Sequence, residues 1–89
     1  MVATGDSDGQ VVAKKRCYTV VLEPQQGGGF TALVPALPEV VSEGETTAEA
    51  MRMVEEAIAL ALDQRRASGL PIPRDVAPRI RKVSLAAAS

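Results

Sequence analysis

Residues 44–62 have the pattern of a long amphipathic helix, and this stretch limits every other assignment in the chain. Thr46 can cap the first turn, and Glu49 can accept a hydrogen bond from the Thr46 backbone N–H to complete a capping box. Gly69 supplies the left-handed residue that ends a helix, after about six turns. The apolar positions in between recur at helical spacing, namely Met51, Val54, Ile58 and Leu62, widened by Ala50, Ala57 and Ala61. Such a helix needs an apolar surface to cover.

The chain is short enough to form one small domain around one thin core. Of its 89 residues, 46% are hydrophobic, but only one is Phe, one is Tyr and none is Trp. A core this light often gains stability from self-association, so we expect a homo-oligomer. The domain is expected over residues 14–85, after a disordered leader at 1–13 and before a short tail at 86–89.

Charge and cysteine content exclude several classes of protein. The formal net charge of −1 gives no overall footprint for nucleic acid or for an anionic membrane. The single cysteine, Cys17, cannot form an internal disulfide. The sequence has no apolar run near the roughly 18 residues that span a bilayer, and no signal-peptide core. These features predict a cytoplasmic protein without a membrane partner.

Three short segments with strand patterns come before the helix. Residues 16–23 are rich in β-branched and aromatic side chains, and a proline follows them. The glutamines and glycines at 25–29 predict a hairpin connection to a second strand at 30–34. Two prolines then make a stiff corner in which Leu37 is expected to plug the end of the core. A third strand is predicted at 39–42.

A fourth strand is predicted after the helix, at residues 76–85, where Arg79 and Arg81 flank Ile80. Charged outer positions of this kind protect a sheet edge. The predicted fold is therefore α+β, with the order β-β-β-α-β in two layers. Three strands form an antiparallel meander, and a right-handed crossover through the helix lays the fourth strand parallel to the first. The sequence leaves open which sheet face the helix covers. The candidate face holds Tyr18, Val20, Leu22, Phe30, Ala32 and Val34.

The chain offers little material for catalysis. It contains no histidine, the commonest general base and metal ligand. Cys17 lies in the middle of a predicted strand, and the serines have no neighbouring base to activate them. Carboxylates remain, and a two-metal nuclease site would need several of them to converge on one spot. The positions argue against convergence, because Glu23 ends a strand, Glu49 serves in the cap, and the helical acids Glu55, Glu56 and Asp63 lie mostly off the apolar stripe. We therefore expect no catalytic residue, no metal and no cofactor. A nuclease remnant stays as a third hypothesis.

Acidic side chains are concentrated between residues 39 and 56. This stretch contains six glutamates and a single basic residue, Arg52. Such a surface can dock a basic partner, because complementary potentials raise the association rate and fix register. The alternative is that acids simply favour the positive end of a helix dipole. The dipole accounts for Glu45 and Glu49, but it does not account for Glu39 and Glu43. The candidate partner-binding residues are Glu39, Glu43, Glu45 and Glu49.

Five segments in this order carry a family resemblance: residues 18–23, a Gly-Gly-Phe step at 28–30, Val-Pro-Ala-Leu-Pro at 34–38, residues 42–50, and Gly-Leu-Pro-Ile-Pro at 69–73. Together they resemble the HicB antitoxin family over roughly residues 18–73. The resemblance implies a partial ribonuclease H-like fold and dimers or tetramers. It also implies a non-catalytic antitoxin that binds and masks a small, basic, RNA-cleaving toxin of the HicA type. The alternative is an orphan HicB-like domain that acts as an oligomeric interaction module without a toxin.

The chain departs from the family pattern at two places. Residues 35–40 read Pro-Ala-Leu-Pro-Glu-Val where the family has Pro-Asp-Leu-Pro-Gly-Cys. Many members also carry a C-terminal DNA-binding domain, for which the few residues after the predicted last strand give no counterpart. Operator binding is therefore not expected. The acidic quartet of ribonuclease H has no counterpart either, so the fold name implies no nuclease activity.

Overall fold

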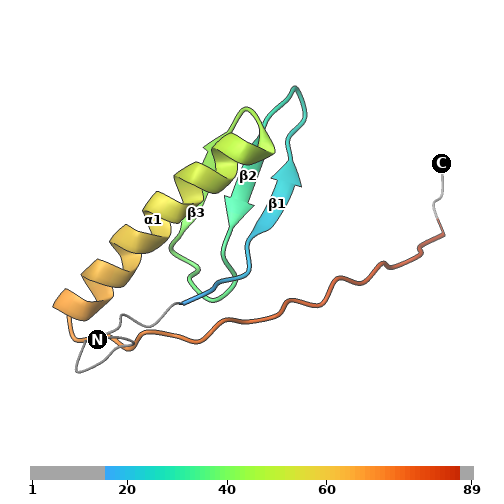
Figure 1. The fold of residues 1–89 in the computed structure, drawn as a ribbon. Coiled ribbons are helices and arrows are strands. Elements are labelled where there is room, and N and C mark those ends of the chain that lie inside the picture. The colour runs from blue at the N-terminus through green and yellow to red at the C-terminus, as the bar shows by residue number, and fades with distance from the viewer. Residues whose placement is uncertain (1–15, 87–89) are drawn as a thin grey trace, which may run out of the picture.

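The computed structural model of the protein describes residues 16–86, in which a three-stranded sheet packs against one long helix (Figure 1). The elements are β1 (Val21–Pro24), β2 (Phe30–Leu33), β3 (Val41–Gly44) and α1 (Thr47–Ala67). The strands lie in the order β1-β2-β3, and both pairs are antiparallel. The predicted meander and helix are confirmed. The expected leader at 1–13, its basic neighbours Lys14 and Lys15, and the last three residues of the expected tail lie outside the described residues.

Both ends of α1 are capped by residues that the sequence identifies. The Thr46 hydroxyl accepts a hydrogen bond from the Glu49 N–H at 3.1 Å. The Glu49 carboxylate binds the Glu45 N–H at 2.7 Å, and not the Thr46 N–H that the capping box predicted. The Glu49 carboxylate thus binds the N–H one residue before Thr46, at the position directly after β3. At the other end Gly69 has φ +72°, and the Leu70 N–H donates to the Arg65 carbonyl at 2.8 Å, as in a Schellman motif.

The core fills the space between α1 and one face of the sheet. The strand register places Leu22 opposite Ala32 and Ala32 opposite Ser42, so these residues share the face that the helix covers. The structure therefore decides the face that the sequence left open. Leu37 is fully buried and closes one end, as predicted. The buried cluster contains Ala32, Val34, Leu37, Val40, Ala50, Val54, Ala61 and Leu62, and Tyr18, Val20, Leu22, Phe30, Met51, Ala57 and Ile58 are among the half-buried residues that pack against it.

Two predicted strand boundaries are wrong, and backbone turns give the reason. The Leu37 N–H donates to the Val34 carbonyl and the Val40 N–H to the Leu37 carbonyl, each at 2.9 Å. These two turns occupy the chain up to residue 40, so β3 begins two residues later than the predicted 39–42. They also lead the chain away after Leu33, the partner of Val21. Residues 16–20 therefore have no β2 partner, and β1 is shorter than the predicted 16–23.

The predicted fourth strand is not formed, because residues 70–86 contain no strand in this structure. Pro78, the one proline within the predicted 76–85, has no N–H to donate to a ladder, and Pro71 and Pro73 stiffen the chain that leads to it. The segment is extended, runs past the beginning of β1 and then leaves the rest of the molecule (Figure 1). Within residues 16–86, no helix has the length and apolar character needed to cross a membrane.

Candidate partner-binding surface

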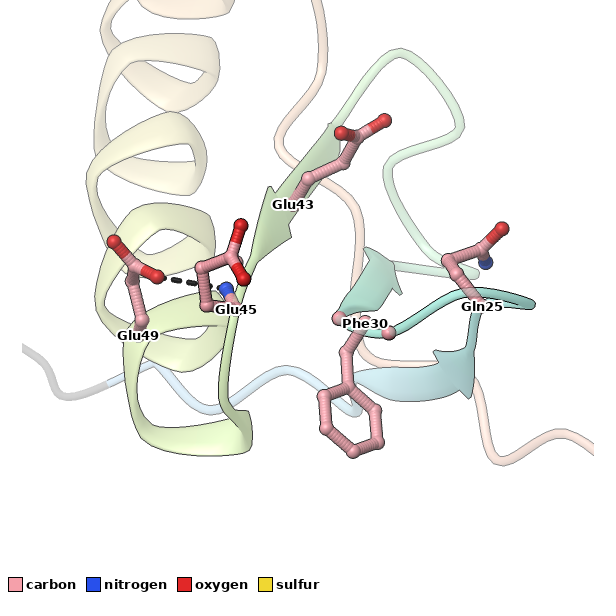
Figure 2. A pocket seen from close by; sticks show the side chains of 8 residues that line it. Gln25, Phe30, Glu43, Glu45 and Glu49 are labelled. Carbon is pink, nitrogen blue, oxygen red and sulfur yellow. Dashed lines mark hydrogen bonds between the residues drawn. The ribbon is translucent and has the colours of Figure 1, made fainter.

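Three of the four predicted carboxylates gather at the N-terminal end of α1. Glu43, Glu45 and Glu49 line one side of an open pocket of about 310 Å³. The other side is the glycine turn between β1 and β2, with Gln25 and Phe30 (Figure 2). The sequence grouped these glutamates by charge density, and the fold places them around one concave surface.

Glycines allow the walls of this pocket to approach one another. A Cβ on Gly44 would lie 2.8 Å from the Ala50 Cα and would meet the Ala50 backbone nitrogen still more closely. The helix can therefore start directly against the end of β3 only because residue 44 has no side chain. Across the pocket, a Cβ on Gly29 would lie 3.1 Å from the Gly44 carbonyl oxygen. Gly29 has φ +85°, which also favours glycine.

The pocket is acidic, and two of its three carboxylates form no ion pair with the residues that the structure describes. One oxygen of Glu49 binds the Glu45 backbone N–H, and the other lies 3.9 Å from the Arg52 guanidinium in an exposed pair. Among residues 16–86, Glu43 and Glu45 form no ion pair through their side chains. The positive end of the α1 dipole reduces the repulsion between these carboxylates. The arrangement suits a basic side chain, which would form charge-assisted hydrogen bonds there.

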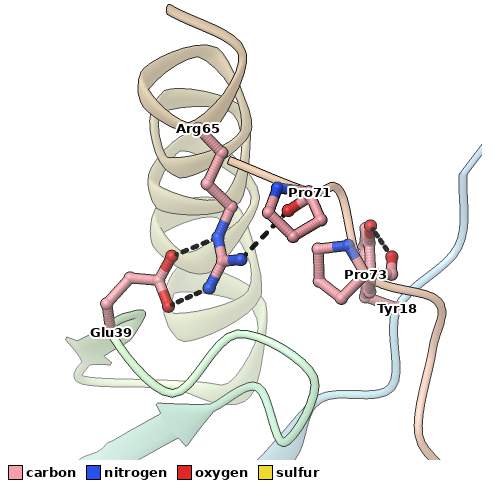
Figure 3. A network of polar contacts seen from close by, with 5 residues as sticks. All are labelled: Tyr18, Glu39, Arg65, Pro71 and Pro73. Atoms are coloured by element: carbon pink, nitrogen blue, oxygen red, sulfur yellow. Dashed lines mark hydrogen bonds and ion pairs between the residues drawn. The ribbon is translucent and has the colours of Figure 1, made fainter. Parts of the chain in front are cut away.

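Glu39 lies at the opposite end of the helix and is bound by Arg65 (Figure 3). The Arg65 Nε and Nη2 atoms donate to the two Glu39 carboxylate oxygens at 2.8 and 3.0 Å. This hydrogen-bonded guanidinium lowers the pKa of Glu39 from its ordinary 4.5 to about 2. Arg65 also donates to the Pro71 carbonyl at 3.1 Å. Glu39 therefore belongs to a structural clamp, away from the other three predicted residues.

A second set of contacts was not found from the sequence, because its partners lie 55 and 56 residues apart. The Tyr18 hydroxyl donates to the Pro73 carbonyl at 2.7 Å. The Thr19 N–H and hydroxyl donate to the two Asp75 carboxylate oxygens, each at 2.7 Å. These bonds lower the pKa of Asp75, the backbone N–H having the largest effect. They fasten the segment after the helix beside the approach to β1. No local pattern in the sequence announces such a contact.

The described part of the chain shows no arrangement of side chains typical of a metal site. In residues 16–86, no three His, Cys, Asp or Glu side chains are placed to hold a metal ion together. Cys17 is a free, exposed thiol. What the acidic pocket can do is bind a cationic group of another molecule.

Comparison with known proteins gives relatives of two kinds. The chain is 38% identical over 58 residues to UPF0150 protein ssr1765 of Synechocystis, covering 65% of this chain and 73% of that protein. It is 35% identical over 63 residues to UPF0150 protein Ta0767 of Thermoplasma acidophilum, covering 71% and 91%. It is 32% identical over 62 residues to Antitoxin HicB 1 of Photorhabdus laumondii, covering 70% of this chain but only 40% of that antitoxin. No family model matches the chain.

Proposed function

We propose, since the chain belongs to the HicB-like antitoxin family, that it binds and masks a small RNA-cleaving toxin of the HicA type. We also propose that it has no catalytic activity of its own. The observation that carries this proposal is the similarity to Antitoxin HicB 1, which extends over 70% of the chain. The similarity covers 40% of that antitoxin, so the functions of its remaining part are not carried over to this chain.

The acidic pocket supplies a contact for a basic toxin. Glu43 and Glu45 can receive a lysine or arginine, while Glu49 keeps the end of the helix in place through its hydrogen bond to the Glu45 N–H. A charge that enters this pocket leaves part of its water shell, so its pairing with the carboxylates adds specificity and speeds association. Masking then follows from steric cover of the toxin, without a chemical step.

The proposal includes the partial ribonuclease H-like fold, a cytoplasmic location and a homo-oligomer. The observed β-β-β-α order is the first part of that fold, and a fourth strand beside β1 would complete it. The thin core and the apolar side chains that remain exposed support self-association.

The test is a binding titration with the HicA-type toxin whose gene neighbours that of this protein. We expect a stable complex that abolishes RNA cleavage. Glu45→Lys should raise the dissociation constant at least about 30-fold, because a like charge would face the toxin's basic side chain. Glu56→Lys makes the same charge change on the exposed surface of α1 and should have a much smaller effect. Isothermal titration calorimetry and an RNA-cleavage assay give the two readouts.

Two results would contradict the proposal in different ways. Equal affinities for Glu45→Lys and Glu56→Lys would remove the acidic pocket from the interface. The absence of a neighbouring toxin gene, together with no inhibition of any HicA-type ribonuclease, would favour an oligomeric interaction module that acts without a toxin.

A further inference from the structure

Three hydroxyl side chains within residues 16–86 have an arginine three positions before them. The pairs are Arg16 with Thr19, Arg65 with Ser68, and Arg81 with Ser84. Both serines, but not the threonine, have a second base two positions before them. Serine/threonine protein kinases often select their targets by such a charge pattern, because carboxylates in the kinase groove pair with the bases. The sequence alone does not choose among these three candidate phosphorylation sites.

The structure can choose among them, because a kinase makes two demands on its target. The segment must be accessible and extended, so that the hydroxyl comes within hydrogen-bond reach of the aspartate that takes its proton. The bases before the hydroxyl must also be free to pair with the carboxylates of the kinase. Both demands can be checked at each of the three positions.

Ser68 meets neither demand, although it lies at the surface. It is the C-cap of α1, with φ −93° and ψ 1°, so the chain is still turned and not extended there. Arg65, three positions before it, is held by the Glu39 carboxylate. Arg66, two positions before it, donates to the Asp63 carboxylate at 3.2 Å. Both bases are therefore already paired within the chain.

Thr19 is also engaged by its own chain. Its side chain belongs to a half-buried residue, and its hydroxyl donates to the Asp75 carboxylate at 2.7 Å. The Thr19 N–H donates to the other oxygen of the same carboxylate at 2.7 Å. A kinase would have to break both hydrogen bonds before it could bind this segment. Thr19 is therefore a poor target.

Ser84 meets both demands. It lies in residues 74–86, all of which are exposed, where the chain is extended and belongs to no helix or strand (Figure 1). Within residues 16–86, neither Arg81 nor Lys82 forms an ion pair. Arg79 adds a third base five positions before the serine. The same local code that is used up at Ser68 is therefore available at Ser84.

The folded domain leaves room for a kinase around Ser84. The segment is fastened at Asp75 by two hydrogen bonds from Thr19. Beyond this point it leaves the rest of the molecule (Figure 1). Ser84 follows nine residues later, and nine extended residues span about 30 Å. The serine is thus presented away from the sheet and the helix.

We propose that Ser84 is a phosphorylation site for a serine/threonine kinase that selects bases two and three positions before its target. The Ser84 Oγ attacks the γ-phosphorus of ATP, and the bond between that phosphorus and the oxygen bridging it to the β-phosphate breaks. ADP leaves with the electron pair, and the hydroxyl proton passes to the aspartate of the kinase. The inference needs no toxin and stands apart from the proposed function.

Phosphorylation would change the charge of this segment and leave the folded domain as it is. Residues 74–86 hold four bases and one acid, a net charge of +3. A phosphate group carries about −2 at neutral pH, so the net charge would fall to about +1. Because Ser84 is exposed and lies outside every helix and strand, the melting temperature should not change.

The first experiment locates the phosphate. The full chain is incubated with ATP, Mg²⁺ and the catalytic subunit of cAMP-dependent protein kinase, a probe that selects bases at these two positions. Intact mass and tandem mass spectrometry should show one phosphoryl group, on Ser84. Ser84→Ala should abolish the modification, and Ser68→Ala should leave it unchanged. A phosphate on Ser68 or Thr19 in place of Ser84, or no phosphate at all, overturns the proposal.

The second experiment tests the role of the bases. Arg81→Ala should lower kcat/KM for phosphorylation at least about 30-fold, because it removes a charge pair with the kinase. Arg74→Ala is the matched control, since it removes another exposed arginine of the same segment, ten positions before the serine. Equal rates for the two variants overturn the proposal. A melting temperature that shifts on phosphorylation would contradict the free placement of Ser84 on which the proposal rests.

Discussion

The two ends of α1 carry carboxylates of the same kind in opposite situations. At the C-terminal end, Glu39 is bound by the Nε and Nη2 atoms of Arg65, and the Nη1 atom donates to the Pro71 carbonyl. At the N-terminal end, Glu43 and Glu45 line an open pocket. The comparison teaches that local charge density does not decide whether a carboxylate is available to a partner. What decides it is the base that the fold brings within reach.

The backbone at the two ends differs in a related way. The C-terminal end is closed by Gly69 in the left-handed region and by hydrogen bonds that the Gly69 and Leu70 N–H groups donate to carbonyls of the last turn. The N-terminal end depends on a close approach at Gly44 and on the side chains of Thr46 and Glu49. The end proposed to bind a partner is thus held by a steric fit and by exposed polar contacts.

The largest expected effect comes from filling the close approach at the N-terminal end. Gly44→Ala would push a Cβ against the Ala50 backbone, which cannot move without shifting α1. We expect the free energy of unfolding to fall by about 3 kcal/mol or more. Gly28→Ala is the control, because its Cβ would meet nothing within 4 Å and only its φ of +114° is unfavourable. Its effect should be about 1–2 kcal/mol. Urea titration measures both, and equal effects would show that the packing at Gly44 is looser than described.

A smaller effect is expected from the N-cap. Thr46→Ala removes the acceptor of the Glu49 N–H and should lower the free energy of unfolding by about 1 kcal/mol. Thr47→Ala changes the neighbouring, exposed threonine at the first helical position and should be close to neutral. If thermal unfolding showed the same stability for both variants, Thr46 would not be acting as the cap.

The smallest effect concerns the clamp at the C-terminal end and its dependence on pH. Arg65 lowers the pKa of Glu39 to about 2, so the folded state favours the ionised carboxylate. The resulting stability is present above pH 4.5, the ordinary pKa, and is lost as the pH falls towards 2. Because the pair is partly exposed, the loss should be modest and smaller at high salt.

Melting temperatures between pH 2 and 6 check this dependence. Glu39→Gln should flatten the curve in that window, and Arg65→Gln should do the same because it removes the other partner. A wild-type curve that matches both variants would contradict a working clamp.

Much of the helix could be predicted from residues close together in the sequence. The cap at Thr46, the buried positions Val54 and Leu62, and the left-handed Gly69 all depend on neighbours within a few residues. The predicted strand boundaries were less accurate. Two consecutive turns come before Val41, and the only sign of them in the sequence is their prolines. The sequence also could not separate Glu39 from the three glutamates of the pocket, because that separation depends on a distant residue. Glu39 stands near Glu43 in the sequence, but its partner Arg65 is 26 residues away.

The sequence by itself determined the order of elements, the apolar surface of the helix and the family resemblance, because these depend on periodicity and on short motifs. The tertiary structure alone decided which sheet face α1 covers, which glutamates share a pocket and where residues 74–86 leave the domain. Those outcomes depend on strand register and on contacts between distant residues, and a one-residue shift in register moves every side chain of a strand to the opposite face. The fourth strand lies at the boundary between the two. Its pattern is present in residues 76–85, but in the structure this segment is extended and pairs with no strand.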